Sequence, residues 1–249
     1  MPRTGEARGT LAVVTPSHEP RIARVAALVA DPARSRMLCR LLSGERATAG
    51  ELARAASVSA STASEHLARL LEAGLVVVET RGRHRWYQLA DAHVAHALEA
   101  LALVAERGSR EREWSHPARR GLREARCCYG HLAGELGVRV LRTMLARGDL
   151  RTDEGGDAGY ELTAPGRERL AALGMAVPAP TRRRYAYACL DWSERSDHLA
   201  GLLADEMLAH FIDQGWLRRT EGRALALTPT GTQRLLPWLA GEPVRSRCG

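Results

Sequence analysis

The most regular pattern of apolar and polar positions lies in the segment Val58–Gln88. Four apolar residues recur there at helical spacing and predict one buried stripe: Ala63, Leu67, Leu70 and Leu71. The hydroxyl residues Ser59 and Thr62 stand where a helix N-terminus needs acceptors for its unpaired amides, and Gly74 ends the pattern. We therefore predict a capped helix that begins near Ser59 and stops at Gly74.

Two apolar, β-branched and aromatic segments follow this helix, Leu75–Val78 and Trp86–Leu89, and predict a β-hairpin. Between them the chain carries Gly82 and four basic residues: Arg81, Arg83, His84 and Arg85. A hairpin tip with this charge repels itself, so it needs solvent or an anionic partner around it. A capped helix followed by a turn and a basic hairpin is the order of a winged helix-turn-helix, which predicts binding to double-stranded DNA.

The polar face of the predicted helix carries short side chains that can approach base edges and phosphates without clashing. We predict DNA contacts from this face and from the hairpin tip: Ser61, Thr62, Ser64, Glu65, Arg69, Arg81, Arg83, His84 and Arg85. The helix residues are expected in the major groove, and the arginines of the hairpin on flanking phosphates or in the minor groove.

Two helices are predicted upstream, a short one at Glu51–Ala56 and another that Asp31 and Pro32 open and that runs to Leu42. With the segments DPARSRMLCRLL, ELARAASVSASTASEHLARLLEAGL and RGRHRWYQL, the chain resembles the ArsR/SmtB family of bacterial winged-helix repressors over about residues 20–105. The resemblance implies a homodimer and an imperfect inverted repeat as the operator. We expect the dimer to form through helices at Arg21–Val29 and His93–Val104, whose apolar stripes are too long to leave in water.

The two metal sites that this resemblance implies are both interrupted. The thiolate pair of one site falls on Ala53 and Ala55. The second site keeps its first half, Asp91 and His93, but its other half falls on two residues that do not ligate metals: Val104 and Arg107.

Two further departures bear on metal binding and on DNA sequence preference. His96 and Glu99 follow His93, which leaves a rearranged metal site open beside the simpler interpretation of a capping Asp91 and surface histidines. In the recognition helix, Glu65 stands where relatives often have His or Gln, and its carboxylate could accept a hydrogen bond from a cytosine amino group.

Length and charge extend this picture. The chain has 249 residues, of which the repressor-like part uses fewer than half. A formal charge of +7 favours a polyanionic partner without distinguishing DNA from RNA or an anionic membrane. The sequence shows neither a membrane-spanning segment nor a signal peptide, so we predict a cytoplasmic protein with no membrane partner. The five cysteines are then expected as free thiols, Cys39 in the core and Cys248 exposed.

We divide the chain into a flexible basic arm (1–19), a winged helix-turn-helix DNA-binding and dimerisation domain (20–106), a linker (107–121) and a regulatory domain (122–243). The last contains an internal repeat, since His131–Gly134 recurs as His198–Gly201 and Leu162-Thr163 recurs as Leu227-Thr228. Each copy predicts a helix, a hairpin and a helix. The predicted fold class is therefore mainly α with small β-hairpins (α+β), a winged helix-turn-helix followed by two helix-hairpin-helix repeats.

Thiols, imidazoles and aromatic rings gather around the repeated quartets. We name six residues as candidates for effector binding: Cys128, Tyr129, His131, Cys189, Trp192 and His198. On a helix Cys128 and His131 would share a face, and alignment of the quartets places Cys128 opposite Arg195 rather than Cys189. The blocks CYGHLAG and CLDWSER resemble a longer ArsR-type subgroup, in which Asp is usual at the position of Gly130.

Three interpretations of these residues stay open. They can be buried core cysteines with bonded histidines, a pocket for a small organic ligand, or a thiol-based sensor of a metal, a metalloid or redox state. The pocket would be lined by four aromatic residues: Tyr129, Tyr185, Tyr187 and Trp192. The spacing fits no closed zinc motif, and no cofactor is identified.

The sequence as a whole predicts a homodimeric transcriptional repressor that an effector bound in its second half releases from DNA. A sequence-tolerant architectural DNA-binding protein is one alternative. The other is a thiol-dependent enzyme with Cys128 as nucleophile and His131 as base. Nothing in the sequence supplies an oxyanion hole or a phosphate loop, so we predict that the chain is not an enzyme.

Overall fold

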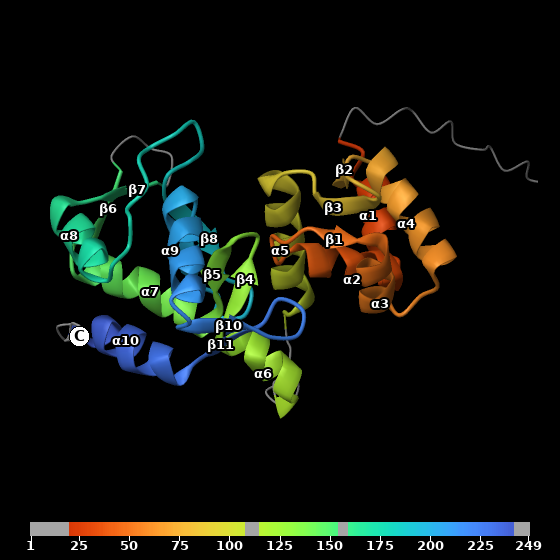
Figure 1. The fold of residues 1–249 in the computed structure, drawn as a ribbon. Helices are drawn as coiled ribbons and strands as arrows, with labels where there is room; N and C mark the ends of the chain where they lie inside the picture. Colours follow the sequence, from red (N-terminus) through yellow and green to blue (C-terminus); the bar gives the residue numbers. More distant parts are fainter. Residues whose placement is uncertain (1–19, 108–114, 154–158, 242–249) are drawn as a thin grey trace, which may run out of the picture.

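The structure is a computed structural model, and it describes residues 20–107, 115–153 and 159–241 (Figure 1). The predicted basic arm, Cys248 and residues 108–114 of the predicted linker lie outside these residues. The fold is α+β, with short antiparallel strands between helices. Two large hydrophobic clusters form, one from buried residues between Met37 and Ala95 and the other from buried residues between Ala125 and Leu239.

The first cluster is enclosed by five helices and a three-stranded sheet of order β1-β3-β2. Its elements are α1 (Ile22–Val29), α2 (Pro32–Leu41), β1 (Ala47–Thr48), α3 (Ala49–Ala56), α4 (Ala60–Glu72), β2 (Val76–Arg81), β3 (His84–Leu89) and α5 (Ala92–Ala105). This is the element order of a winged helix-turn-helix, with α4 as the second helix and β2–β3 as the wing.

Side-chain caps set the starts of α2, α3, α4 and α5. The Ser59 hydroxyl accepts from the amide of Thr62 at 3.2 Å, so the predicted start of the recognition helix is confirmed. Helix α3 begins earlier than predicted because Thr48 and Glu51 form a capping box. The strands of the wing are longer than the apolar pattern predicted, since they run through the arginines and leave only a two-residue turn at Gly82, whose φ is +59°.

The second cluster is enclosed by the remaining elements, which repeat the order hairpin, helix, hairpin, helix after an initial helix α6 (Pro117–Glu124). The first copy contains β4 (Arg126–Cys128), β5 (His131–Ala133), α7 (Gly134–Ala146), β6 (Leu150–Thr152), β7 (Tyr160–Leu162) and α8 (Ala164–Ala172). The second contains β8 (Tyr187–Leu190), β9 (Asp197–Ala200), α9 (Leu202–Asp213), β10 (Leu217–Arg219), β11 (Leu225–Leu227) and α10 (Pro229–Ala240).

Each copy therefore opens with a hairpin that the sequence pattern did not predict. The placement of Cys128 and His131 on one helix was wrong: they face each other across β4–β5. Tyr129 and Gly130, with φ of +50° and +112°, form the two-residue turn, a conformation that a helix excludes. Helix α6 begins within the segment assigned to the linker.

The pairing register corrects the predicted alignment of the two copies. Cys128 pairs with His131 in the first hairpin, and Cys189 pairs with His198 in the second. Cys189 is therefore the structural counterpart of Cys128, and the alignment with Arg195 was wrong. The two hairpins differ in turn length, so equal sequence spacing did not mark equivalent positions.

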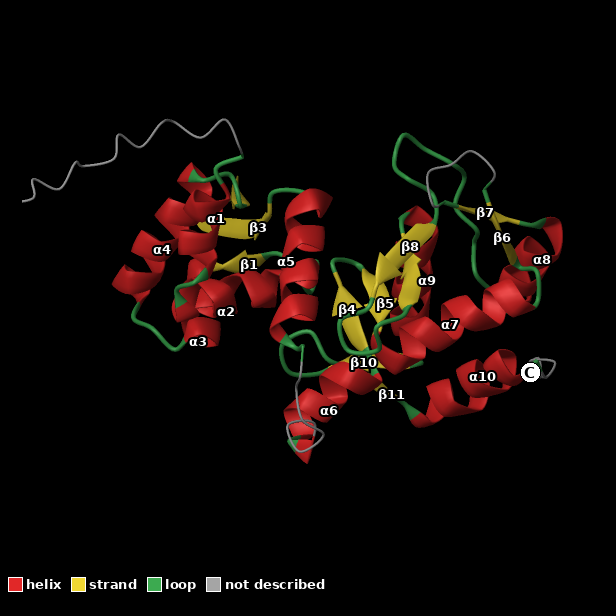
Figure 2. Ribbon diagram, turned by 180° about the vertical axis from the view of Figure 1, so that it is seen from behind, coloured by secondary structure: helices red, strands yellow, loops and turns green. Residues whose placement is uncertain are grey.

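The β4–β5 hairpin also packs against the first cluster. The amide of Tyr129 donates to the carbonyl of Leu42 at 2.7 Å, and the Cys127 thiol lies 3.0 Å from the carbonyl of Ser43. Gly44 lies so close that a Cβ there would meet the amide nitrogen of Gly130 at 2.8 Å. Figure 2 shows α5 beside β4 and β5, so the helix that closes the winged domain adjoins the repeats.

Candidate functional site

The polar face of α4 is open to solvent. Ser61, Ser64, Glu65 and Arg69 are exposed and Thr62 is half-buried, whereas the opposite stripe is buried. The Ser64 hydroxyl bonds to the carbonyl of Ala60 within the helix. The predicted base-reading residues are thus available to a ligand as large as duplex DNA.

The tip of the wing is exposed at all four basic residues: Arg81, Arg83, His84 and Arg85. Arg81 donates to both oxygens of Glu79, at 2.8 and 3.3 Å, and this ion pair holds the pKa of the Glu79 carboxyl below its ordinary value. Arg85 lies over the ring of Tyr87 at 5.7 Å. The wing therefore presents Arg83 and His84 at its turn. Neighbouring side chains hold the other two basic residues, Arg81 through Glu79 and Arg85 through Tyr87.

His66 does not belong to the exposed face. Its Nδ1 lies 3.2 Å from Nη1 of Arg34, and Nε of Arg34 donates to the carbonyl of Leu28. The ring thereby joins α4 to the buried Arg34 of α2, and its role is to hold the recognition helix in place.

The interrupted metal positions of the winged domain now have structural roles. Asp91 caps α5 by accepting from the amide of Val94 at 3.0 Å. Glu99 is buried and forms an ion pair with Arg223, and His96 lies 3.3 Å from the Tyr187 hydroxyl. Glu99 and His96 thus connect α5 to the repeats. The prediction that Cys39 lies in the core was wrong, because its side chain is exposed on α2.

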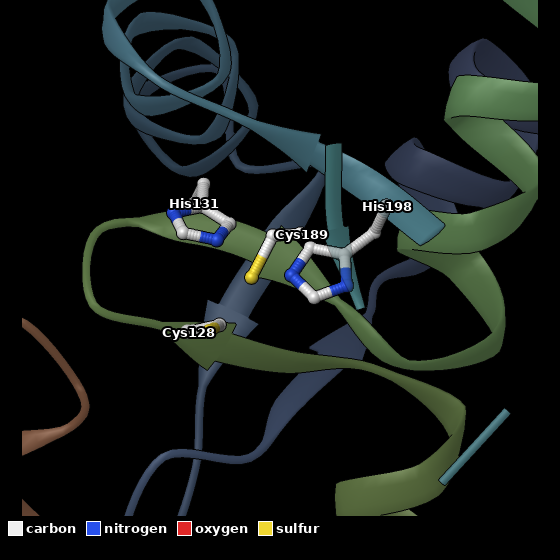
Figure 3. Close-up of side chains that lie close together, drawn as sticks. All are labelled: Cys128, His131, Cys189 and His198. Carbon is white, nitrogen blue, oxygen red and sulfur yellow. The ribbon is translucent and has the colours of Figure 1, made fainter. Parts of the chain in front are cut away.

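The two hairpins β4–β5 and β8–β9 bring together four of the predicted effector residues: Cys128, His131, Cys189 and His198. All four are buried, and one sulfur or nitrogen atom from each lies within 4.8 Å of the others (Figure 3). The two imidazole rings have centroids 5.1 Å apart. We call this group the thiol–imidazole cluster.

Two carboxylates stand behind the imidazoles. Nδ1 of His198 lies 3.3 Å from Oδ2 of Asp191, and Nδ1 of His131 lies 3.7 Å from Oδ1 of Asp205. Nε2 of both rings and Nδ1 of His198 are buried and have no hydrogen-bond partner among the described residues. In Figure 3 one nitrogen of each ring faces the sulfur atoms.

Asp191 is the most heavily bonded side chain in this part of the fold. Its Oδ1 accepts from Nη2 of Arg126 at 2.9 Å and from the amide of Ser193, and its Oδ2 accepts from the amide of Gly134 at 2.7 Å. The side chains of Asp191 and Arg126, which form an ion pair, are both fully buried. Burial alone would raise the pKa of Asp191, but His198, Arg126 and the amide donors hold this pKa well below its ordinary value.

Protonation of the Cys128 thiol disfavours nucleophilic catalysis. Hydrogen bonding to Cys189, together with burial, raises the pKa of the Cys128 thiol to about 12. Burial lowers the pKa of His131, while the Cys128 sulfur and the Asp205 carboxylate raise it to about 9. A thiol of this kind becomes a good ligand only when a cation displaces its proton.

Of the four aromatic residues, Tyr187 packs against the buried Cys128 and Cys189, and the other three lie elsewhere. Tyr129 packs against the first hydrophobic cluster and Tyr185 against the second, where its hydroxyl donates to the carbonyl of Pro178. Tyr187 faces His96, and Trp192 is buried beneath the guanidinium of Arg126, 4.5 Å from its ring.

A wide apolar groove runs between α1 and α5. It has a volume of about 1000 Å³ and is lined by residues of both helices and by Glu72 and Ala73. Its walls include large apolar side chains that are 41 to 72 % exposed: Ile22, Val25, Leu101 and Val104. A continuous apolar face of this kind is a common feature of protein–protein interfaces.

Sequence reasoning missed the charged residues that organise the cluster. Asp205 comes from the first turn of α9, and its carboxylate lies 3.1 Å from the position a Cβ on Gly130 would take. The carboxylate of Asp205, from α9, thus lies beside Gly130, the position at which the resembling subgroup usually has Asp. The buried Arg126 was also missed, because one arginine among many carries no signal in the sequence.

Comparison with known proteins identifies relatives over most of the chain. The helix-turn-helix domain family matches residues 29–79. An uncharacterised HTH-type transcriptional regulator of Bacillus subtilis, YdfF, is 38% identical over 215 residues, which cover 85% of this chain and 94% of that protein. The HTH-type transcriptional regulator CmtR of Mycobacterium tuberculosis is 42% identical over 86 residues, 34% of this chain and 72% of CmtR.

Solved structures match the first part of the chain. A homodimeric winged helix-turn-helix DNA-binding domain of Mycobacterium bovis, described as possibly ArsR-family, is 27% identical and aligns over 39% of this chain and 84% of its own, with a TM-score of 0.32. The NMR structure of the cadmium sensor CmtR from Mycobacterium tuberculosis is 42% identical over 32% of this chain and 81% of its own, with a TM-score of 0.28. Within the described ranges, no helix is long and apolar enough to cross a membrane.

Proposed function

Because this chain belongs to the ArsR/SmtB type of winged helix-turn-helix transcriptional regulators, we propose that it is a homodimeric repressor of transcription. In this proposal it binds an inverted-repeat operator and is released by an effector sensed in the C-terminal repeats. The observation that carries the proposal is the exposure of the polar face of α4 together with the four basic residues of the wing.

The docking follows from the chemistry of these two surfaces. The short side chains of Ser61, Thr62 and Ser64 let the helix approach base edges in the major groove. The wing supplies cations for phosphates or for the minor groove, which fix register and contribute affinity for any sequence. Arg69, one turn further along α4, is placed for a phosphate contact.

The apolar groove between α1 and α5 supports the homodimer. Ile22, Val25 and Leu101 leave an apolar surface in water that a second copy of the same helices can cover. A twofold axis at this groove would present two recognition helices, which matches the symmetry of an inverted repeat.

The contacts of α5 support effector sensing in the repeats. This helix carries both the proposed dimer surface and the buried Glu99, whose carboxylate forms an ion pair with Arg223, between β10 and β11. A change in the repeats that moves α5 would change the spacing of the two recognition helices. A coupling of about 1–3 kcal/mol between effector and operator is enough for regulation.

The test is binding of the full chain to fluorescent DNA from its own promoter and to unrelated DNA of equal length, followed by anisotropy. Specific binding should be tighter by at least about a thousandfold. Equal affinity for both fragments would contradict a repressor and favour the architectural alternative. Sedimentation in parallel should give a dimer for the wild type and a folded monomer for Leu101→Glu, whereas a folded wild-type monomer at micromolar concentration would contradict the dimer.

A further inference from the structure

The thiol–imidazole cluster has the composition of a metal centre. Two sulfur and two nitrogen donors, one from each strand of two neighbouring hairpins, lie within 4.8 Å of one another. In a tetrahedral zinc site with bonds of about 2.0–2.3 Å, neighbouring ligand atoms are about 3.3–3.8 Å apart. A contraction of about 1 Å by side-chain rotation would therefore close the four donors around one ion.

The placement of two carboxylates beside the imidazoles also fits a metal ion. Each Nδ1 faces a carboxylate, Asp191 behind His198 and Asp205 behind His131, so Nε2 is the nitrogen left for a ligand. Both Nε2 atoms are buried without a hydrogen-bond partner among the described residues, which is costly for a polar atom. A carboxylate that holds the far nitrogen of a histidine is the usual outer support of a metal-bound imidazole.

The charge of the four ligands also suits a divalent cation. Two thiolates neutralise one divalent cation, and two imidazoles add no charge, so the loaded centre is neutral and can stay buried. Sulfur and imidazole donors in tetrahedral geometry favour zinc or cadmium over the harder magnesium and calcium. With four protein ligands the centre has no open position, which suits holding an ion rather than hydrolysis.

Buried charged residues connect the thiol–imidazole cluster to α5, which carries the proposed dimer surface. Asp191, behind His198, bonds Arg126 at 2.9 Å, and Nη2 of Arg126 lies 3.9 Å from Oε2 of Glu99 on α5. Tyr187, two residues before Cys189, reaches His96 of the same helix at 3.3 Å. A shift of the β8–β9 hairpin on metal binding would therefore act on α5 at two points.

We propose that Cys128, His131, Cys189 and His198 form a closed tetrahedral site for a divalent cation of the zinc and cadmium class, and that its occupancy weakens operator binding. The binding site stands on the geometry of the cluster alone, whereas the effect on the operator rests on the proposed function. Each metal ion that binds displaces into solvent the protons of the two thiols and any proton held on the nitrogen that becomes a ligand, so no oxidant or reductant is needed.

The site is tested by titrating the full-length, chelator-treated and reduced protein with Co²⁺, and then displacing it with Zn²⁺. One equivalent per protomer should give the strong visible absorption of tetrahedral cobalt with thiolate ligands. Cys128→Ser and His198→Gln should lose this spectrum. Cys39→Ser and His93→Gln, which remove an exposed thiol and an exposed imidazole elsewhere, should keep it.

Asp205→Asn keeps all four ligands and tests the outer carboxylate. It should weaken Zn²⁺ binding by about 10- to 100-fold while the near-ultraviolet circular dichroism of the apoprotein stays unchanged. This variant also guards against loss of binding through misfolding, because Asp205 is partly exposed on α9. A weak, octahedral cobalt spectrum in the wild type, or an unchanged one in Cys128→Ser, would overturn the site.

Operator binding is then measured with and without one equivalent of Zn²⁺. We expect the metal to weaken operator binding at least tenfold in the wild type and to have no effect in Cys128→Ser. Apoprotein that binds the operator but takes up no metal would overturn this inference and leave the repressor standing. Metal uptake without any operator binding would instead overturn the proposed function, and tetrahedral uptake with unchanged operator affinity would overturn only the regulatory half.

A disulfide between Cys128 and Cys189 is the competing outcome. Mass spectrometry of protein purified without reductant would detect it as a loss of two hydrogens. If that bond forms and the reduced protein binds neither Co²⁺ nor Zn²⁺, the cluster is a redox site and the proposed metal centre is overturned.

Discussion

The hairpin of the wing and the β4–β5 hairpin of the thiol–imidazole cluster both close with a two-residue turn but lie in opposite surroundings. The wing ends in four exposed basic residues, whereas every residue of β4 and β5 is buried. In the wing the turn faces solvent; in β4–β5 the turn is held against the winged domain through Tyr129 and Leu42. The exposed wing is accessible to a macromolecule such as DNA, whereas the buried β4–β5 hairpin can contact only a ligand small enough to fit inside the protein.

The same contrast applies to charge. In the wing, Arg81 pairs with Glu79 in water, where an ion pair contributes little to stability. Behind the cluster, Arg126 pairs with Asp191 where neither side chain is exposed, so the loss of one partner would leave a buried charge. Charges on the wing are thus available for DNA, and charges behind the cluster are committed to the fold.

Asp191→Ala should give the largest effect, because it leaves Arg126 buried without its carboxylate. We expect a loss of about 3–5 kcal/mol in the free energy of unfolding. Urea denaturation followed by tryptophan fluorescence measures this, and Glu79→Ala in the wing is the matched control, expected to leave the midpoint nearly unchanged. Equal midpoints for the two variants would contradict the contrast between the hairpins.

Acid should also remove the stabilisation that the charged Asp191 carboxylate gives the wild-type fold. The pKa of Asp191 is lower in the folded chain than in the unfolded one, so its charged form stabilises the fold above about pH 4. That contribution is lost as pH falls further. The stability difference between wild type and Asp191→Asn should shrink on going from pH 6 to pH 3, and a difference that grows on acidification would reverse the sign of this account.

Glu65→Gln tests base reading by the exposed face of α4. An amide in place of the carboxylate should change the preferred base at one position of each half-site, by about 1–3 kcal/mol, and leave folding unchanged. Binding to an operator library before and after the substitution measures it. An identical preference in both proteins would show that Glu65 does not face a base.

Arg83→Ala tests the wing and should have the smallest effect. Because the wing is expected to contact phosphates, the loss should be uniform over all sequences and should lower the salt dependence of binding by about one unit. Binding at several salt concentrations gives the slope, with Arg218→Ala in the exposed part of β10 as the control. A sequence-dependent loss would instead assign Arg83 to a base.

The winged domain could be predicted closely from the sequence because its signals are local. The hydroxyl of Ser59, the apolar stripe of α4 and the basic tip each act within a few residues, so each can be identified without the fold. The strand β1 was not predicted, because its two residues, Ala47 and Thr48, are too few to show the alternation of apolar and polar positions that indicates a strand.

The cluster could be predicted only in its residue types. Cys128, His131, Cys189 and His198 were singled out, but the placement of Cys128 and His131 on one helix was wrong, and the two turns of unequal length concealed the equivalence of Cys128 and Cys189. Asp205 and Arg126 reach the site through tertiary packing alone. Their roles depend on contacts between segments about 65 residues or more apart, as in the bond of Arg126 to Asp191, which no local pattern encodes.

Hydrogen–deuterium exchange of the full chain with and without its promoter DNA tests the division between the exposed and buried hairpins most directly. We predict slower exchange on DNA binding in the first turns of α4 and in β2–β3, and no direct protection of β4–β5, whose residues are already buried in the free protein. Protection confined to residues 116–241, with α4 and the wing unchanged, would contradict the account.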